Sequence, residues 1–252
     1  MSKRSSVTIS PGNNQQAPPP LPPVISIVLP VLNEVQVLAE TLVGLPFAAD
    51  VETILVDGGS TDGTWELAGY FPHLLRLRAP RGRGCQMNAG ALASRGELLA
   101  FLHADTLLGP AHLAALRRAA ADPAFTAGAF ELALSPPTPA LRFIAWGANW
   151  RSRRLGLPYG DQVLILRRDL FHALGGFAHR RPEDLDLVFR LQRCSRLRLL
   201  SPPVISSGRR WLEQGYFAAT RRHWLALARH LAERLFTKRW RTQGDMFIGG
   251  GG

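Results

Sequence analysis

Residues 102–106, LHADT, place an imidazole and a carboxylate two positions apart, at His103 and Asp105. Side chains alternate along a strand, so both groups would face the same side if the strand continues through this segment. A carboxylate suits Mg²⁺ or Mn²⁺, whereas imidazole is a poor ligand for Mg²⁺ and an acceptable one for Mn²⁺. The segment predicts either a divalent-metal site formed by Asp105 and His103 or the polar end of a strand. Taken alone, it favours the strand end.

Two adjacent acids, Glu183 and Asp184, follow a proline in RRPEDLDL, residues 180–187, ahead of a helical pattern. Acids at a helix start are ordinarily stabilised by the helix dipole. The alternative is that one of them is a general base on an acceptor hydroxyl, a role that typically contributes about 10²–10⁴-fold in rate. Alone, the pair favours the structural interpretation.

The segment DGGSTDGT, residues 57–64, puts Asp57 at a predicted strand end, before a glycine-rich turn and a helix that begins near Thr64. Candidates for the N-cap of that helix are Ser60, Thr61 and Asp62. Asp57 can accept a hydrogen bond from a nucleobase N–H, while the helix amides face anionic groups. An ordinary capped turn explains the segment equally well. A dinucleotide fingerprint does not fit, because RGRGCQ lacks the G-x-G-x-x-G spacing.

These residues need a scaffold that brings strand ends together. Buried apolar runs at 24–31, 51–56, 74–78 and 97–106 alternate with helical stretches, which predicts a mostly parallel α/β sheet. In such sheets ligands bind at the carboxyl ends of the strands. Asn33, Asp57 and Asp105 all fall at such ends. Further strands are expected at 124–134 and 161–167, with a helix at 139–154 between them.

Composition and charge narrow the class of protein. The 252 residues carry 46% hydrophobic residues and a net charge of +11, as expected of a folded domain that attracts nucleotide phosphates, anionic lipid or nucleic acid. Nucleic acid is the least favoured of these partners, because aromatic residues are not interleaved with the basic ones. Only Cys85 and Cys194 occur, without metal-type spacing, so a reducing cytoplasm is expected. No apolar run is long enough to span a bilayer.

The two ends of the chain differ from its centre. Residues 1–23, rich in Pro, Ser, Asn and Gln, lack the apolar core of a signal peptide and are predicted to be a disordered leader. Residues 213–245 place Trp224, Leu227, Leu231 and Leu235 at helical spacing among arginines and lysines. Such a basic amphipathic helix either contacts the membrane peripherally at its inner face or packs on the domain. The narrow apolar stripe favours packing. Residues 246–252 are predicted to be a disordered tail.

Taken in order along residues 24–215, the motifs resemble the family 2 inverting glycosyltransferases with the GT-A fold. ISIVLPVLNE resembles the first strand of that family, and DGGSTDGT its usual DDGSTDGT with Gly58 replacing the second aspartate. MNAGALASRGELLAFLHAD resembles the stretch that leads into the D-x-D motif. LHADT, YGDQ, ALGGF, the ED pair and SGRRW, in this order, are closer still to a bacterial subgroup associated with arsenosugar biosynthesis, in which His-Ala-Asp commonly replaces Asp-x-Asp.

The resemblance implies a GT-A domain over residues 24–212 that transfers a sugar from a UDP- or GDP-sugar to an unknown acceptor hydroxyl with inversion. The implied nucleotide site consists of Pro30, Asn33, Glu34, Asp57, Gly58, Ser60, Asp62, Arg83, Asn88 and Ala104. Asp184 would be the catalytic base, with Glu183 beside it. The implied donor or acceptor contacts are Asp161, Gln162, Arg210 and Trp211. Asp105, with His103, would hold a divalent cation, Mn²⁺ or Mg²⁺.

Two other classes of function stay open at this point. One is a catalytically silent partner that binds a nucleotide sugar within a larger assembly. The other, less favoured, is a basic nucleic-acid-binding protein, which would show a steep salt dependence of binding to arbitrary DNA.

Overall fold

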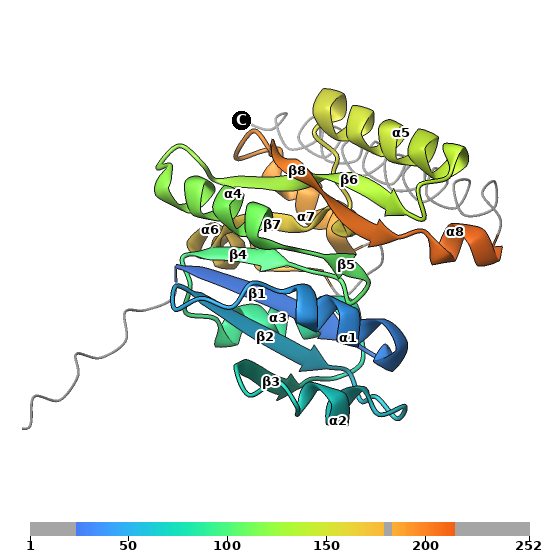
Figure 1. Cartoon of the computed structure of the whole chain (residues 1–252). Helices are drawn as coiled ribbons and strands as arrows, with labels where there is room; N and C mark the ends of the chain where they lie inside the picture. Colours follow the sequence, from blue (N-terminus) through green and yellow to red (C-terminus); the bar gives the residue numbers. More distant parts are fainter. Residues whose placement is uncertain (1–23, 179–182, 215–252) are drawn as a thin grey trace, which may run out of the picture.

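The computed structural model describes residues 24–178 and 183–214 as one sheet with helices on both faces (Figure 1). The predicted leader and all but the first two residues of the predicted C-terminal segment lie outside the described residues. The strands are β1 (Ile25–Val31), β2 (Val51–Asp57), β3 (Leu74–Arg78), β4 (Leu98–Phe101), β5 (Thr106–Leu107), β6 (Ala127–Ser135), β7 (Leu164–Arg167) and β8 (Arg198–Ser207). The helices are α1 (Val35–Gly44), α2 (Thr64–Ala68), α3 (Arg83–Ala93), α4 (Pro110–Ala121), α5 (Pro139–Leu155), the 3₁₀ turn η1 (Gly160–Gln162), α6 (Arg168–Ala173), α7 (Glu183–Leu191) and α8 (Arg209–Gln214).

The strand order is β3-β2-β1-β4-β7-β6-β8-β5. β3, β2, β1 and β4 run parallel, as predicted, and β6 pairs parallel with β8. β7 is antiparallel to both of its neighbours, and β5 is antiparallel to β8. The sheet is therefore mixed, with a parallel half in which Val31 pairs with Asp57. That register brings the loops that follow β1 and β2 to the same edge.

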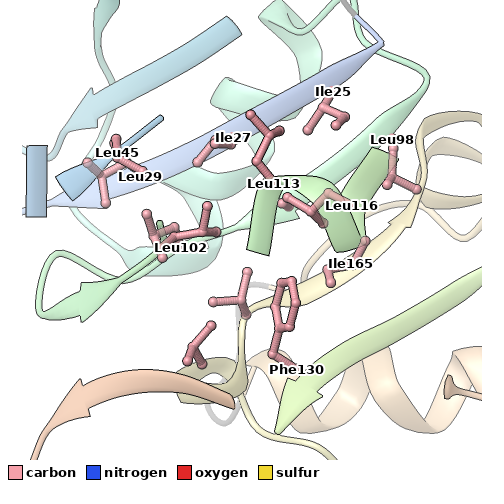
Figure 2. Packing of buried hydrophobic residues seen from close by; sticks show 14 of the residues in the cluster. Ile25, Ile27, Leu29, Leu45, Leu98, Leu102, Leu113, Leu116, Phe130 and Ile165 are labelled. Atoms are coloured by element: carbon pink, nitrogen blue, oxygen red, sulfur yellow. The ribbon is translucent and has the colours of Figure 1, made fainter. Parts of the chain in front are cut away.

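The sheet separates two hydrophobic layers, because neighbouring residues of a strand point to opposite faces. Ile27 and Leu29 of β1 pack in one layer with α1 and α4. Figure 2 shows this layer, with Leu113 and Leu116 on α4 and Phe130 on β6. Val28 faces the other layer, built on α3, α6 and α7. A third cluster joins Trp211 of α8 to α5 and β6. Each fully buried side chain of this size contributes about 1.5–3 kcal/mol relative to an exposed one.

The strand predicted over residues 97–106 is wrong at its end. β4 stops at Phe101, and residues 102–105 form a turn in which the Thr106 amide donates to the His103 carbonyl at 3.2 Å. The parallel pairing with β1 ends at Val28 and Phe101, and the chain then turns so that β5 can pair with β8. The strand alternation assumed for His103 and Asp105 therefore does not apply, although both still line one cavity.

The N-cap predicted for α2 is also wrong. The N-cap residue is Gly63, in a left-handed conformation with φ 93° that favours glycine, and it makes no side-chain cap. Asp62 instead accepts hydrogen bonds from the amide and hydroxyl of Thr64, at 3.0 and 2.6 Å. Within the described part of the chain, no helix combines the length and the apolar character needed to cross a membrane.

Candidate active site

Asp57, the last residue of β2, binds the backbone of the loop that follows that strand. Its side chain is fully buried. Its carboxylate accepts hydrogen bonds from the amides of Gly59 and Ser60, at 3.2 and 3.1 Å, and from the Ser60 hydroxyl. The Arg78 guanidinium approaches the same carboxylate at 3.9 Å. The structure thus places Asp57 at the strand end as predicted, with its oxygens holding the glycine-rich turn in shape.

The loops after β1 and β2 are tied to each other through predicted site residues. The Asn33 amide donates to the Ser60 hydroxyl, and the Thr61 amide donates to the Asn33 side-chain oxygen, both at 2.9 Å. Asp62 accepts a hydrogen bond from the Val35 amide at 3.1 Å. Asn33 has φ 55°, a left-handed conformation that asparagine tolerates better than most residues. This cross-linking fixes one rim of the site.

A cavity of about 220 Å³ opens beside these loops. Three elements line it: the end of β1 with the loop that follows, the start of α3, and the turn at 103–105. The predicted site residues among its walls are Pro30, Glu34, Arg83, His103, Ala104 and Asp105. The cavity lies at the carboxyl edge of the parallel half, where such sheets bind ligands.

The start of α3 gives one wall of the cavity a positive character. α3 begins at Arg83, and its N-cap Gly82 (φ 142°) makes no side-chain cap. The first amides of a helix lack intrahelical partners and attract anions, and Arg81 and Arg83 add formal charge. Gln86 anchors this helix, because its side-chain amide donates to the carbonyls of Val31 and Val56 at 2.7 and 2.9 Å. Arg81 and Gln86 were not among the predicted residues.

Arg83 connects one of the two predicted acids, Glu183, to the imidazole of His103. Its Nε lies 3.0 Å from Oε1 of Glu183, whose side chain is only 6% exposed. Its Nη1 lies 3.3 Å from Nε2 of His103. A guanidinium can only donate, so this contact is favourable when Nε2 of His103 is the unprotonated nitrogen. The Glu183 carboxylate therefore pairs with the Arg83 guanidinium and orients it.

Asp184 and the same imidazole both lie next to Gly160. The Gly160 amide donates to Oδ2 of Asp184 at 2.9 Å, and the Leu185 amide donates to Oδ1 at 2.9 Å. A Cβ atom at residue 160 would lie 2.8 Å from Nε2 of His103 and 3.3 Å from Oδ2 of Asp184. Only a glycine therefore fits here without displacing one of them. Gly160 was missed in the sequence, although YGDQ had been singled out.

The pKa of the neighbouring Tyr159 hydroxyl depends on the charges around Gly160. Burial of the Tyr159 side chain raises the pKa of its hydroxyl. The guanidinium of Arg151, stacked 3.7 Å from the ring centroid, opposes that rise, whereas the carboxylates of Asp184 and Asp161 add to it. Asp161 and Asp184 therefore each lie near enough to the Tyr159 hydroxyl to affect its pKa.

Several predicted residues do not line the cavity, and three of them hold other parts of the fold together. Asn88 clamps the backbone of Phe177, accepting from its amide at 2.8 Å and donating to its carbonyl at 2.9 Å. Gln162 is fully buried and donates to the Phe130 carbonyl at 3.0 Å. Trp211 is 7% exposed and packs in the cluster with α5. The Arg210 side chain is outside what the structure describes.

The residues that line the cavity supply only some of the ligands that a divalent cation needs. Among the residues that the structure describes, no group of three or more His, Cys, Asp or Glu side chains is placed to hold a metal ion. Asp105 and His103 nevertheless line one wall together. Mg²⁺ sites commonly use one or two carboxylates and take the remaining ligands from substrate phosphates and water. The donor set therefore suits a cation shared with a bound diphosphate.

Comparison with known proteins matches residues 26–186 to the family model described as Glycosyl transferase family 2. The PGL/p-HBAD biosynthesis glycosyltransferase of Mycobacterium tuberculosis (strain H37Rv) is 37% identical over 94 residues, which cover 34% of this chain and 37% of that protein. Validoxylamine A glucosyltransferase of Streptomyces hygroscopicus is 31% identical over 112 residues, 40% of this chain and 26% of that protein. The chain thus spans well under half the length of these curated relatives.

Two solved structures share the fold. The mannosyltransferase PcManGT from Pyrobaculum calidifontis, in complex with GDP-Man and Mn²⁺, superposes with a TM-score of 0.62 at 24% identity, over 88% of this chain and 67% of that chain. S. aureus TarS 1–349 in complex with UDP-GlcNAc gives a TM-score of 0.58 at 17% identity, over 73% of this chain and 58% of that chain. At these identities the likeness concerns the architecture.

Proposed function

Since this chain belongs to glycosyl transferase family 2 and has the GT-A fold, we propose that it transfers a sugar from a nucleoside-diphosphate donor to an acceptor hydroxyl, with inversion at the anomeric carbon. The observation that carries the proposal is one juxtaposition. The positive start of α3 lines a cavity together with His103 and Asp105, and Asp184 lies beside Gly160, which also adjoins that imidazole.

The donor nucleotide occupies the rim and the cavity. The loops after β1 and β2, cross-linked through Asn33, hold the nucleoside, with Asp57 beneath them. The diphosphate lies against the first turn of α3, where Arg81, Arg83 and the helix amides offset its charge. Glu183 keeps Arg83 turned toward the cavity.

Asp184 acts as the general base. Its Oδ2, fixed by the Gly160 amide, takes the proton of the acceptor hydroxyl as that oxygen attacks the anomeric carbon from the face opposite the diphosphate. The bond between the anomeric carbon and the diphosphate oxygen breaks with inversion. The nucleoside diphosphate leaves as an anion and remains beside Arg83, which stabilises the developing charge.

Asp105, together with His103, would hold a divalent cation at the diphosphate. When bound, Mn²⁺ or Mg²⁺ would supply Lewis-acid neutralisation of the leaving group. Because Nε2 of His103 lies 3.3 Å from Arg83, Asp105 would be the main ligand.

The proposal extends to the subgroup, the donor and the acceptor. The order of LHADT, YGDQ, ALGGF, ED and SGRRW supports membership of the subgroup associated with arsenosugar biosynthesis. The proposed donor is a UDP-sugar or a GDP-sugar, and the acceptor group is a hydroxyl. Cys85 and Cys194 are not joined by a disulfide, which agrees with a reducing, cytoplasmic setting.

The test is nucleotide release from UDP-, GDP-, ADP- and dTDP-sugars in the presence of Mn²⁺, Mg²⁺ or EDTA. We expect release from one donor, lost with EDTA and lost in Asp105→Ala. Asp169→Ala, an exposed acid on α6, serves as the control and should behave as wild type. If all donors stay intact without an acceptor, calorimetry with the free nucleotides follows. Metal-dependent binding without turnover on any acceptor would favour the silent sugar-nucleotide-binding partner, and no binding would contradict the proposal.

A further inference from the structure

The outer face of α5 carries three large aromatic side chains. Phe143, Trp146 and Trp150 are 70%, 60% and 47% exposed. Their spacing of three and four residues places them on one face of the helix, and the rings of Phe143 and Trp146 stack with centroids 5.6 Å apart. The opposite face of the helix packs in the third hydrophobic cluster through Leu141, Ala145 and Ala148. The aromatic stripe is therefore not needed to attach α5 to the sheet.

The charged residues of α5 itself are all positive. Between residues 139 and 155 the sequence contains four arginines and no acid. Arg153 pairs with Glu131, and Arg151 donates to the Leu157 carbonyl while stacking on a tyrosine ring. Arg142 and Arg154 are exposed and lie on either end of the stripe.

Soluble monomeric proteins rarely expose a contiguous apolar patch of this kind unless it contacts something. Tryptophan is favoured at the boundary between water and lipid, because its ring is apolar and its N–H keeps a polar partner. Arginines beside such rings are attracted to anionic headgroups. We propose that the outer face of α5, formed by Phe143, Trp146, Trp150, Arg142 and Arg154, docks onto an anionic lipid surface.

This face adjoins the candidate site without forming part of it. No α5 residue lines the cavity at His103 and Asp105. The helix is nevertheless coupled to the site, because Arg151 stacks on Tyr159 and the next residue, Gly160, donates its amide to Asp184. Docking through α5 would therefore hold the Asp184 side of the site close to the lipid, a consequence that rests on the proposed function. The docking itself does not.

Vesicle flotation of the full chain tests the docking. Wild type should float with vesicles of phosphatidylcholine mixed with phosphatidylglycerol, and weakly with phosphatidylcholine alone. The double variant Trp146→Ser, Trp150→Ser should lower the partition coefficient by about ten-fold or more. The reason is that it removes two aromatic rings that would be partly buried in the lipid. Arg142→Gln with Arg154→Gln should lower it about five-fold per arginine, with a smaller loss at high salt. The matched control is Tyr70→Ser with Leu92→Ser, residues 82% and 80% exposed on other elements, and it should bind as wild type.

Four results would overturn the proposal. In the first, wild type does not bind the anionic vesicles. In the second, the tryptophan variant binds them as tightly as wild type, which would assign binding to another segment. The tryptophan variant could melt several degrees lower, which would mean that another part of the chain covers the face, for example residues 215–245, which follow α8. Light scattering could show a dimer that the variant abolishes, which would make the occupant a second copy. Since donor and acceptor are absent from these assays, failure here leaves the proposed activity untouched.

Discussion

At the residue scale, Asp184 is positioned by two backbone amides, and this makes the role of its charge testable. In Asp184→Asn the side-chain oxygen can still accept from the Gly160 amide, but the group cannot take a proton. We expect the transfer rate to fall by about 10²–10⁴-fold with the nucleotide Kd unchanged. Turnover and calorimetry measure the two quantities. Asp186→Asn, on the same helix and paired with Arg190, is the control. Normal turnover by the asparagine variant would remove Asp184 as the base.

Glu183, the neighbouring acid, should act through a different residue. Its contact with Arg83 makes it a positioning residue, so Glu183→Gln should weaken nucleotide binding by about three- to ten-fold as Arg83 loses its charged partner. The rate at saturating donor should change much less. Arg83→Lys, which keeps a charge without the guanidinium fork, should weaken binding similarly. A loss of turnover as deep as that of Asp184→Asn would instead identify Glu183 as the base.

At the scale of elements, α3 must lie unusually close to the sheet to present its first turn to the cavity. A Cβ atom at Gly90 would meet Cγ1 of Val28 well inside contact distance and Cγ2 of Val56 at 3.0 Å. Gly90→Ala should therefore cost about 1–3 kcal/mol, or several degrees in Tm, by forcing the helix away from β1 and β2.

The matched control for this substitution lies on another helix. Gly147 of α5 has no atom within 4 Å of an added Cβ, so Gly147→Ala should stabilise the protein by about 0.5–1 kcal/mol through helix propensity alone. Thermal melts compare the two variants. Equal melting temperatures would contradict the close packing of α3.

The sequence predicted these elements better than the contacts between them. The alternation of apolar runs and helical stretches identified the parallel half, and the strand-end rule placed Asn33, Asp57 and Asp105 at one edge. The end of β4 was missed, because it depends on where pairing with β1 stops, which is a tertiary fact. Trp211 was expected from the resemblance to contact the donor or acceptor, but burial of a tryptophan against a helix, here α5, is equally typical. Gly160 was overlooked although it stands directly before the predicted Asp161 in YGDQ.

At the scale of the whole molecule, the two halves of the sheet divide the site between them. The parallel half supplies the loops after β1 and β2 and the start of α3. The other half supplies η1, which precedes β7 and is hydrogen-bonded to β6, and through Gly160 it reaches Asp184. The proposed transfer therefore requires the two halves to stay in register across the β4–β7 pairing. The opposite edge of the sheet, away from the cavity, carries a partly buried acid that contributes to this integrity.

That acid is Glu52, which joins β1, β2 and the turn before β4. Burial raises its pKa, but hydrogen bonds from the Ser26 hydroxyl and from the Arg95 and Gly96 amides outweigh burial and leave the pKa below the usual 4.5. A folded-state pKa that is lowered adds stability above the unfolded pKa, and this stability is lost as the pH falls through the folded value. Glu52→Gln should therefore cost about 1–3 kcal/mol at pH 7, and the difference from wild type should shrink below about pH 4.

Denaturant unfolding of both proteins between pH 7 and the acid limit measures this difference. Glu66→Gln, an exposed acid on α2, should show a small effect at every pH. A pH-independent cost for Glu52→Gln would mean that the side chain contributes through packing alone. A cost that shrinks on acidification would instead show that the charge of Glu52 joins the ends of three strands, and that the sheet loosens in acid from the edge opposite the cavity.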